Sequence, residues 1–305
     1  MAGAAGGCSR AAAFGSSRVL ALKGTNGIII WSRDDLGWLM RYRALALRQC
    51  VSSVLLGAAS VVHAAGQHYE GYAYDIDEGK LLYRESHWLY TEDNIERHLI
   101  VYRCANGDPF ARKHINAAAG AVTPDFDMLD ARSGLREGVR TREGHREIFE
   151  QANAKATEHH APLTIPQNAV IDAGLDAFVR THWNALSDTG VSPVPLLVAS
   201  RLGYMDFSAH KLRDARADPD DIRWFRLTLA SWSFLGAALP HIEIAYDAVT
   251  HERREYRGYV DIRGDDNKNL KVRIEFPPSE RHTDVALADV ARADQTPLTG
   301  RCSLH

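Results

Sequence analysis

The chain has 305 residues, with 36 lysines and arginines against 39 aspartates and glutamates, and a formal charge of −3 at pH 7. A chain of this length can bury one sizeable core or two smaller ones. Its charge balance lacks the basic field that nucleic-acid binding requires, so we expect no nucleic-acid partner.

Residues 40–65 have the order of a secretory signal peptide. Three arginines precede an uncharged run at 50–62, and small residues follow that run. The apolar run is shorter than the roughly 20 residues that a transmembrane helix needs, so we expect no stable membrane span after cleavage. The mature protein would begin near Gly66 and would be periplasmic or secreted.

Residues 1–39 precede this signal and show no sustained period. We interpret them as a disordered leader that comes from an over-extended reading frame, with Met40 as the true start; a genuine long leader is the alternative. Removing residues 1–64 leaves 29 basic and 37 acidic residues, a formal charge of −8. We expect residues 66–305 to form one exported, acidic domain.

Two cysteines remain after cleavage, Cys104 and Cys302. The compartment predicted above is oxidising, which favours a disulfide between them that would fix the C-terminal tail. Two free thiols are the alternative.

Most of the mature sequence has the pattern of short strands. Alternation and β-prone residues mark segments near the start of the mature chain and again in its last third. The connection at 263–269 is dense in turn-forming residues, which predicts a hairpin within an antiparallel meander. The segments that carry these patterns are 72–76, 81–90, 95–104, 222–229, 242–246, 254–262 and 270–276, and the stretch 196–207 is also expected to be a strand.

One segment, from Asn168 to Ser187, has a helical period instead. Ile171, Leu175 and Phe178 recur at intervals of three and four residues. The predicted fold is therefore α+β: a curled antiparallel sheet, similar to a half-barrel, packed on this one main amphipathic helix.

Catalytic and metal motifs are weak. His251 and Glu252 begin a zinc-protease-like pattern, but the second histidine is absent and the region is β-rich. His159 and His160 could form a surface metal clasp, although a solvated loop is the better interpretation. Asp265 begins a calcium-like spacing that a hairpin turn explains better. No nucleophile elbow and no glycine-rich phosphate loop occurs, so we expect no cofactor and name no catalytic or metal-binding residue.

Aromatic residues are frequent in the predicted strands, and core packing is their simplest role. A curved sheet too open for one helix to fill would instead leave an apolar trough suited to a lipid or another apolar molecule. We expect such a trough to be lined by Trp88, Trp183, Tyr204, Trp224 and Trp232.

Several stretches resemble an uncharacterised family of exported bacterial proteins. The matching residues are Leu82-Tyr83-Arg84-Glu85-x-His87, Pro124-Asp125-Phe126 with Asp130, Phe178-Val179-Arg180-x-His182-Trp183-x-Ala185-Leu186, Ser200-Arg201-Leu202-x-Tyr204, and Ile244-x-Tyr246-Asp247 with Tyr256-Arg257-Gly258. The second half also looks like the half-barrel of the lipoprotein-localisation carriers, a likeness of fold that implies no catalytic residue.

Three functions remain as hypotheses. The first is a non-enzymatic envelope protein that binds or carries an apolar, lipid-like ligand. The second is a hydrolase or metal-dependent enzyme that uses histidine and carboxylate side chains gathered in space, and the third is a structural or partner-binding module with an exposed strand edge. The lining of the largest cavity distinguishes the first two: apolar and deep for a carrier, polar with convergent histidines for an enzyme.

Overall fold

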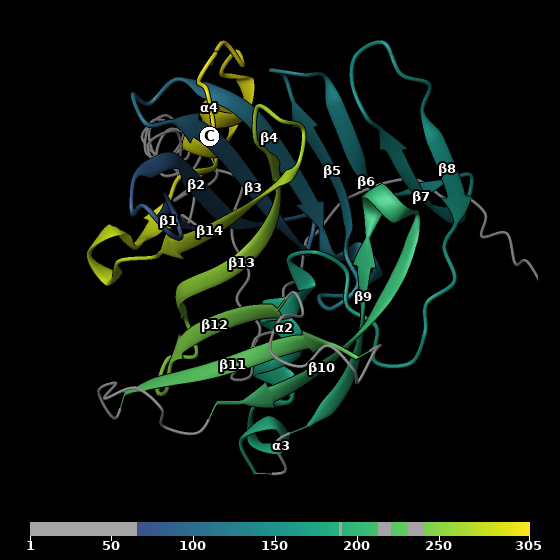
Figure 1. Ribbon diagram of the computed structural model, residues 1–305, viewed down its shortest axis with the longest axis vertical. Helices are drawn as coiled ribbons and strands as arrows, with labels where there is room; N and C mark the ends of the chain where they lie inside the picture. Colours follow the sequence, from purple (N-terminus) through teal and green to yellow (C-terminus); the bar gives the residue numbers. More distant parts are fainter. Residues whose placement is uncertain (1–65, 189–190, 213–220, 231–240) are drawn as a thin grey trace, which may run out of the picture. The chain divides into compact units, whose positions relative to one another are not determined.

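The computed structural model describes residues 66–188, 191–212, 221–230 and 241–305 (Figure 1). The predicted leader and signal peptide lie outside these residues. In the described part of the chain, no helix has the length and apolar character needed to span a membrane.

A single antiparallel sheet of 15 strands organises the described residues. Its strands are β1 (Gly66–Asp75), β2 (Leu81–Glu92), β3 (Ile95–Cys104), β4 (Pro109–Asn116), β5 (Asp125–Asp130), β6 (Leu135–Arg142), β7 (His145–Gln151), β8 (His159–Pro162), β9 (Ser192–Val198), β10 (Gly203–Lys211), β11 (Ile222–Leu229), β12 (His241–Asp247), β13 (Arg253–Arg263), β14 (Asn269–Glu275) and β15 (His282–Val285). The helices are α2 (Gly174–Thr181), α3 (Trp183–Asp188) and α4 (Leu287–Gln295), with short 3₁₀ turns η1 (Ala117–Ala119), η2 (Ala199–Arg201) and η4 (Pro278–Glu280).

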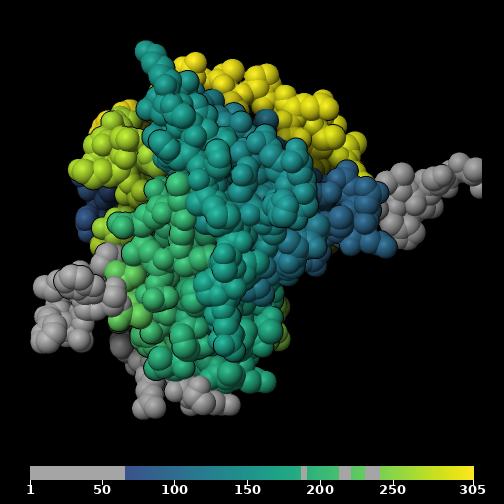
Figure 2. Space-filling view, turned by 90° about the vertical axis from the view of Figure 1, so that its right-hand side faces the viewer, coloured from purple at the N-terminus to yellow at the C-terminus, as the bar shows by residue number. Residues whose placement is uncertain are grey.

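The sheet consists of two antiparallel meanders, β1–β8 and β9–β14, which are joined where β1 pairs with β14. Strands β1 to β8 follow one another in space, and β14 to β9 continue from the free side of β1 in reverse chain order. The sheet does not close, and β8 and β9 are its ends. The two halves nevertheless meet, because η2 contacts β6 and β7, and in Figure 2 the teal and green segments lie against each other.

The prediction of an α+β fold with one main helix is wrong. The structure is mostly antiparallel sheet, and its helices are short and lie on both faces. Helices α2 and α3 pack on β10–β12 through Phe178, Trp183 and Phe225. On the opposite face, Val290 and Ala293 of α4 pack with Trp88 and Leu99.

The backbone explains why helix α2 is shorter than the helix predicted over 168–187. Val170 bonds to the edge strand β9, with its N–H donating to the Pro195 carbonyl at 2.8 Å, so it is extended rather than helical. Asp172 then has a left-handed φ of 45°, and the helix begins only at Gly174. His182 ends α2 and separates it from α3.

The strand predictions for the first and last parts of the domain are confirmed, as is the 263–269 hairpin. The expected strand at 196–207 is two strands, because η2 and a left-handed Leu202, with φ of 50°, turn the chain between β9 and β10. No sequence pattern predicted the strands β4 to β8.

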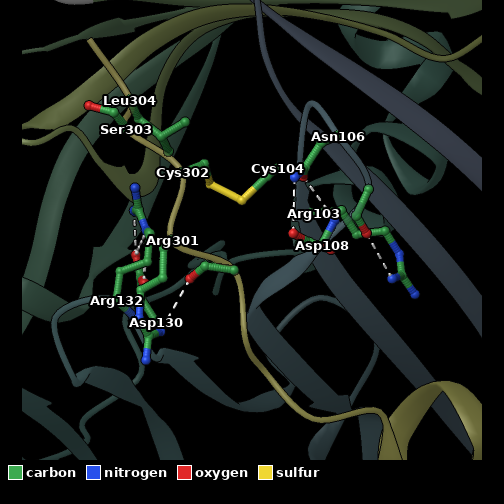
Figure 3. The surroundings of a disulfide bond; sticks show 12 residues. Arg103, Cys104, Asn106, Asp108, Asp130, Arg132, Arg301, Cys302, Ser303 and Leu304 are labelled. Atoms are coloured by element: carbon green, nitrogen blue, oxygen red, sulfur yellow. Dashed lines mark hydrogen bonds and ion pairs between the residues drawn. A yellow bond between two sulfur atoms is a disulfide. The ribbon is translucent and has the colours of Figure 1, made fainter.

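The predicted Cys104–Cys302 disulfide is present, with the two Cα atoms 5.5 Å apart (Figure 3). It attaches the C-terminal tail to the end of β3. Beyond it, the side chain of Leu304 is buried and its N–H donates to Oδ1 of Asp265 at 3.0 Å. Asp265 therefore anchors the tail, in the turn where the sequence showed a calcium-like spacing.

Candidate active site

A cavity of about 190 Å³, here called the central cavity, lies among strands of both meanders and the start of α2. Strands β2 to β6 supply one side, β9 and β12 to β14 supply the other, and residues 172–176 contribute from α2 and the turn before it. Charged and polar side chains are prominent in its wall: Glu85, His87, His98, Lys113, Glu137, Asp172, Asp176, Arg253 and Asp261.

Strand register places several of these side chains on one face. His87 is paired with Ile100, Ile100 with Lys113, Lys113 with Met128, and Met128 with Glu137. Directly opposed residues in neighbouring strands point to the same side of a sheet. The row across β2 to β6 therefore carries a histidine, a lysine and a glutamate on the face that forms the cavity, and all three are buried.

Lys113 holds two aspartates that are distant in the sequence. Its Nζ donates to Oδ1 of Asp172 at 2.5 Å and to Oδ2 of Asp261 at 2.7 Å. The lysine side chain is only 5% exposed, whereas that of Asp261 is 41% exposed. This arrangement, here called the lysine–aspartate group, connects β4, the turn before α2 and β13.

The two aspartates differ in protonation tendency. Burial raises the pKa of Asp172 in spite of the Lys113 charge. Burial also acts to raise the pKa of Asp261, but the charge and hydrogen bond of Lys113, together with a hydrogen bond shared with Asp172, lower it overall. Such divergence is typical of two carboxyl groups that share one proton. Of the two carboxyl groups, Asp172 therefore binds a proton more readily, and Asp261 is the one that stays ionised.

Glu137 adds a third carboxyl group to this wall. Burial, followed by the negative charge of Asp261, raises the pKa of Glu137 to about 8, against the opposing charges of Lys113 and Arg263. A neutral carboxyl group at pH 7 is a potential proton donor.

A second polar group continues along β2 and β3. Nε2 of His87 lies 3.0 Å from Oε2 of Glu85, and Nδ1 of His87 lies 2.9 Å from Nε2 of His98. The Tyr69 ring stacks on His87 with 4.4 Å between ring centroids. Glu85 and His87 are buried, while His98 is half-buried and lines the cavity.

Arg253 provides a second cation in the wall. Its guanidinium lies 3.8 Å from Oδ2 of Asp176 and stacks over the Phe276 ring at 4.4 Å. The Tyr246 hydroxyl donates to Oδ1 of Asp176 at 2.6 Å. Burial acts to raise the pKa of Asp176, but Arg253 and this hydrogen bond lower it overall, so Asp176 is ionised and balances Arg253.

Gly174 allows α2 to begin close to the sheet. A Cβ at this position would lie 2.0 Å from the backbone oxygen of Val122, which no small adjustment of a side chain can relieve. We expect Gly174→Ala to lower the free energy of unfolding by about 1–3 kcal/mol, the usual cost of overpacking. Displacing Asp172 from Lys113 would contribute to this cost. Urea unfolding measures the change.

Gly203→Ala is the matched control, since a Cβ at Gly203 meets only the Arg201 oxygen at 3.8 Å. We expect this substitution to change the free energy of unfolding by less than about 1 kcal/mol. Equal effects of the two substitutions would contradict the close approach of α2.

The aromatic residues expected to line a trough are not brought together. Trp88 packs beneath α4, Trp183 lies in the α3 core, and Trp224 is contacted by Arg257 on β13. Tyr204 packs against the main core cluster. None of these four lines the central cavity, and Trp232 lies outside the described residues.

The histidine motifs noted in the sequence also lie apart from the cavity. His159 and His160 are exposed on the edge strand β8, and His251 stacks on Trp183 at 3.9 Å. Within the described residues, no three histidine, cysteine, aspartate or glutamate side chains gather as a group that could hold a metal ion.

Comparisons with known proteins identify no relative. No family model, curated protein or solved structure matches the chain. The resemblance to exported bacterial proteins and to lipoprotein-localisation carriers therefore stays a prediction.

Sequence patterns did not single out the cavity residues, although one signal was present. Glu85 and His87 entered only through the family resemblance. Their spacing of two places both side chains on one face of a strand, opposite to the face of Trp88. A carboxylate and a histidine between Tyr83 and Leu89 on one face of a strand indicate a polar site. Lys113, Asp172 and Asp261 offered no comparable local signal.

Proposed function

We propose that the protein is an acid–base enzyme, most simply a hydrolase, that acts on a small polar substrate in the central cavity. The observation that carries the proposal is the lysine–aspartate group: Lys113 between Asp172 and Asp261, whose pKa values are shifted in opposite directions. Perturbed carboxyl pairs inside a cavity are characteristic of catalytic sites.

Each residue of the group has a distinct role. Asp261, ionised and the more exposed of the two carboxylates, would act as the base that removes a proton from water. Asp172, with its raised pKa, would supply a proton to the leaving group. Lys113 would hold both carboxyl groups in place and balance their charge. Because the two carboxyls titrate as a pair, the rate should depend on pH in a bell-shaped manner.

The lining of the central cavity supports an enzyme more than a carrier of apolar ligands, although a second cavity, of about 290 Å³, is larger. A binding trough for acyl chains needs apolar walls, whereas nine charged or histidine side chains line this cavity. Its volume of about 190 Å³ is also below the roughly 300–1,000 Å³ of pockets that enclose drug-sized ligands. A single small polar group fits these dimensions.

The proposed site of action is outside the cytoplasm. The signal-like order of residues 40–65 is one support for this proposal. The Cys104–Cys302 disulfide is another, since disulfides persist in oxidising compartments.

Hydrolysis of chromogenic substrates tests the function. We expect the purified protein to hydrolyse nitrophenyl compounds of at least one class among esters, glycosides and phosphates. Asp172→Asn and Asp261→Asn should each lower kcat/KM by at least about 100-fold, the usual contribution of a positioned acid or base. Thermal melts should show that both variants remain folded at the assay temperature.

Asp127→Asn is the matched control. Asp127 lies on β5, is 42% exposed and pairs with Arg136 at 2.6 Å, away from the cavity. We expect its kcat/KM to equal that of the wild type. Failure to hydrolyse all three classes, or full activity in both cavity variants, would refute the proposal.

A further inference from the structure

Glu85, His87 and His98 form a continuous line of hydrogen bonds from a buried carboxyl group to a cavity wall. The spacing is 3.0 Å from Glu85 to His87 and 2.9 Å from His87 to His98. His98 lines both the central cavity and a second cavity of about 290 Å³. Glu85 and His87 also line the central cavity, so His98 is the only member of the line that reaches the second cavity.

We propose that these three residues form a proton relay that connects the second cavity, at His98, with the carboxyl group of Glu85 in the wall of the central cavity. The relay rests on the proposed acid–base function for its use, because it would supply protons to that reaction or remove them. Its existence can nevertheless be tested without substrate.

The geometry allows two arrangements of the same hydrogen bonds. In the first, Glu85 is ionised, Nε2–H of His87 donates to Oε2 of Glu85, and Nε2–H of His98 donates to Nδ1 of His87. In the second, the carboxyl O–H of Glu85 donates to Nε2 of His87, and Nδ1–H of His87 donates to Nε2 of His98. Both arrangements satisfy every bond of the line.

One proton converts the first arrangement into the second. A donor in the second cavity loses its proton to Nδ1 of His98. The Nε2–H bond of His98 breaks as Nδ1–H forms on His87, and the Nε2–H bond of His87 breaks as O–H forms on Glu85. The donor has lost one proton, Glu85 has gained one, and both imidazoles end neutral with their tautomers exchanged.

The surroundings favour these neutral imidazoles. Burial and then the Arg253 charge lower the pKa of His87 well below its ordinary value, and burial, His87 and Arg253 do the same for His98. Burial raises the pKa of Glu85 against the charges of Arg253 and Lys113, which favours the carboxyl as the place where the proton rests. The charged or titratable side chains that act on the line are Arg253, Asp176, Arg281, Lys113, Asp261 and His68.

Packing holds the middle of the line in place. The Tyr69 ring stacks on His87 at 4.4 Å, and Phe276 contacts it edge-on at 5.7 Å. His87 therefore accepts a proton from His98 at Nδ1 and gives one to Glu85 from Nε2 without turning its ring. The hydroxyl of Tyr83, 3.4 Å from Oε1 of Glu85, contacts the other oxygen of the carboxyl group and leaves Oε2 to the relay.

Nitrogen NMR of the histidine-labelled full-length protein tests the relay. As the pH is lowered in the absence of substrate, we expect His87 and His98 to exchange from the Nε2–H to the Nδ1–H tautomer at one common pH, above the ordinary range of an exposed glutamate. Infrared spectra should show one carboxylic acid C=O band growing over the same pH interval. Neither ring should form an imidazolium while the protein is folded.

Glu85→Gln should abolish the pH dependence of the exchange, because an amide does not ionise. Glu78→Gln, in the exposed turn between β1 and β2, should leave it unchanged. An imidazolium at either histidine, separate midpoints for the two rings, or exchange that persists in Glu85→Gln would overturn the relay. If Glu85→Gln does not fold, the wild-type infrared band decides: its absence during the exchange rejects Glu85 as the acceptor.

The two proposals can fail separately. Tautomer exchange in a protein that hydrolyses none of the test substrates would support the relay and reject the hydrolase. Hydrolysis that depends on Asp172 and Asp261, with fixed histidine tautomers, would support the hydrolase and reject the relay.

Discussion

Replacing Lys113 by methionine is expected to lower the free energy of unfolding by about 3 kcal/mol at pH 7. The lysine is buried between Asp172 and Asp261, and its removal leaves two carboxyl groups without their cation. Breaking a buried ion pair by removing one partner costs about 3–5 kcal/mol. We expect the lower end of this range because Asp261 is partly exposed.

The loss should become smaller as the pH falls from 7 to 5. Without Lys113, the pKa values of Asp172 and Asp261 rise above those of the unfolded chain, so the folded state binds more protons than the unfolded state. Stability then increases with decreasing pH, since the slope of the unfolding free energy against pH follows the difference in bound protons. In the wild type, the stabilisation from the raised Lys113 pKa is present throughout this range, because it is lost only above the pKa of an unfolded lysine.

Urea unfolding of both proteins at pH 7 and pH 5 measures these values. Lys80→Met is the control, since Lys80 is exposed in the turn between β1 and β2 and should change stability by less than about 0.5 kcal/mol. A Lys113→Met variant that is as stable as the wild type at pH 7 would show that the lysine–aspartate group does not contribute to the fold.

Reducing the Cys104–Cys302 disulfide is expected to lower the free energy of unfolding by about 2–4 kcal/mol. The bond joins residues 198 positions apart, so it removes much conformational freedom from the unfolded chain. We expect the loss of unfolding free energy to be smaller than the full effect of closing so long a loop, because other contacts also hold the tail. Gly300 donates its N–H to the Pro109 carbonyl at 2.8 Å, and Leu304 is bonded to Asp265.

Urea unfolding with and without reductant gives the size of this effect. The double substitution Cys104→Ser and Cys302→Ser should have the stability of the reduced wild type and should not respond to reductant. Limited proteolysis should release the tail more readily from the reduced wild type and from the double variant than from the oxidised wild type. Equal stability of oxidised and reduced wild type would contradict a stabilising role for the bond.

The clearest strand prediction is that of β14, whose inward face is apolar. Its Val272 and Ile274 point inward and alternate with charged residues, which is the period that marks a half-buried strand. Strands β4 and β6 do not show this period, because Lys113 and Glu137 are buried within them. These two charged residues thus hide the strands that carry them.

The predicted helix shows a different limit. Its apolar period is real, and Leu175 and Phe178 are buried as expected. The period also included Ile171, which lies beside Val170 in a segment bonded to β9. An apolar residue at this place is buried whether the backbone is extended along β9 or helical. Hydrophobicity by itself therefore could not show where the pairing with β9 ends and where α2 begins.

The sequence by itself determined the antiparallel meander of the last third of the chain and its hairpin at 263–269, and it favoured the pairing of the two cysteines that the structure confirms. These depend on local alternation, turn chemistry and the small number of possible partners. Only the tertiary structure decided the site, because Lys113 meets Asp172 and Asp261 across 59 and 148 residues of sequence. Strand register and the approach of the two meanders bring these side chains together, and neither is encoded in any local pattern.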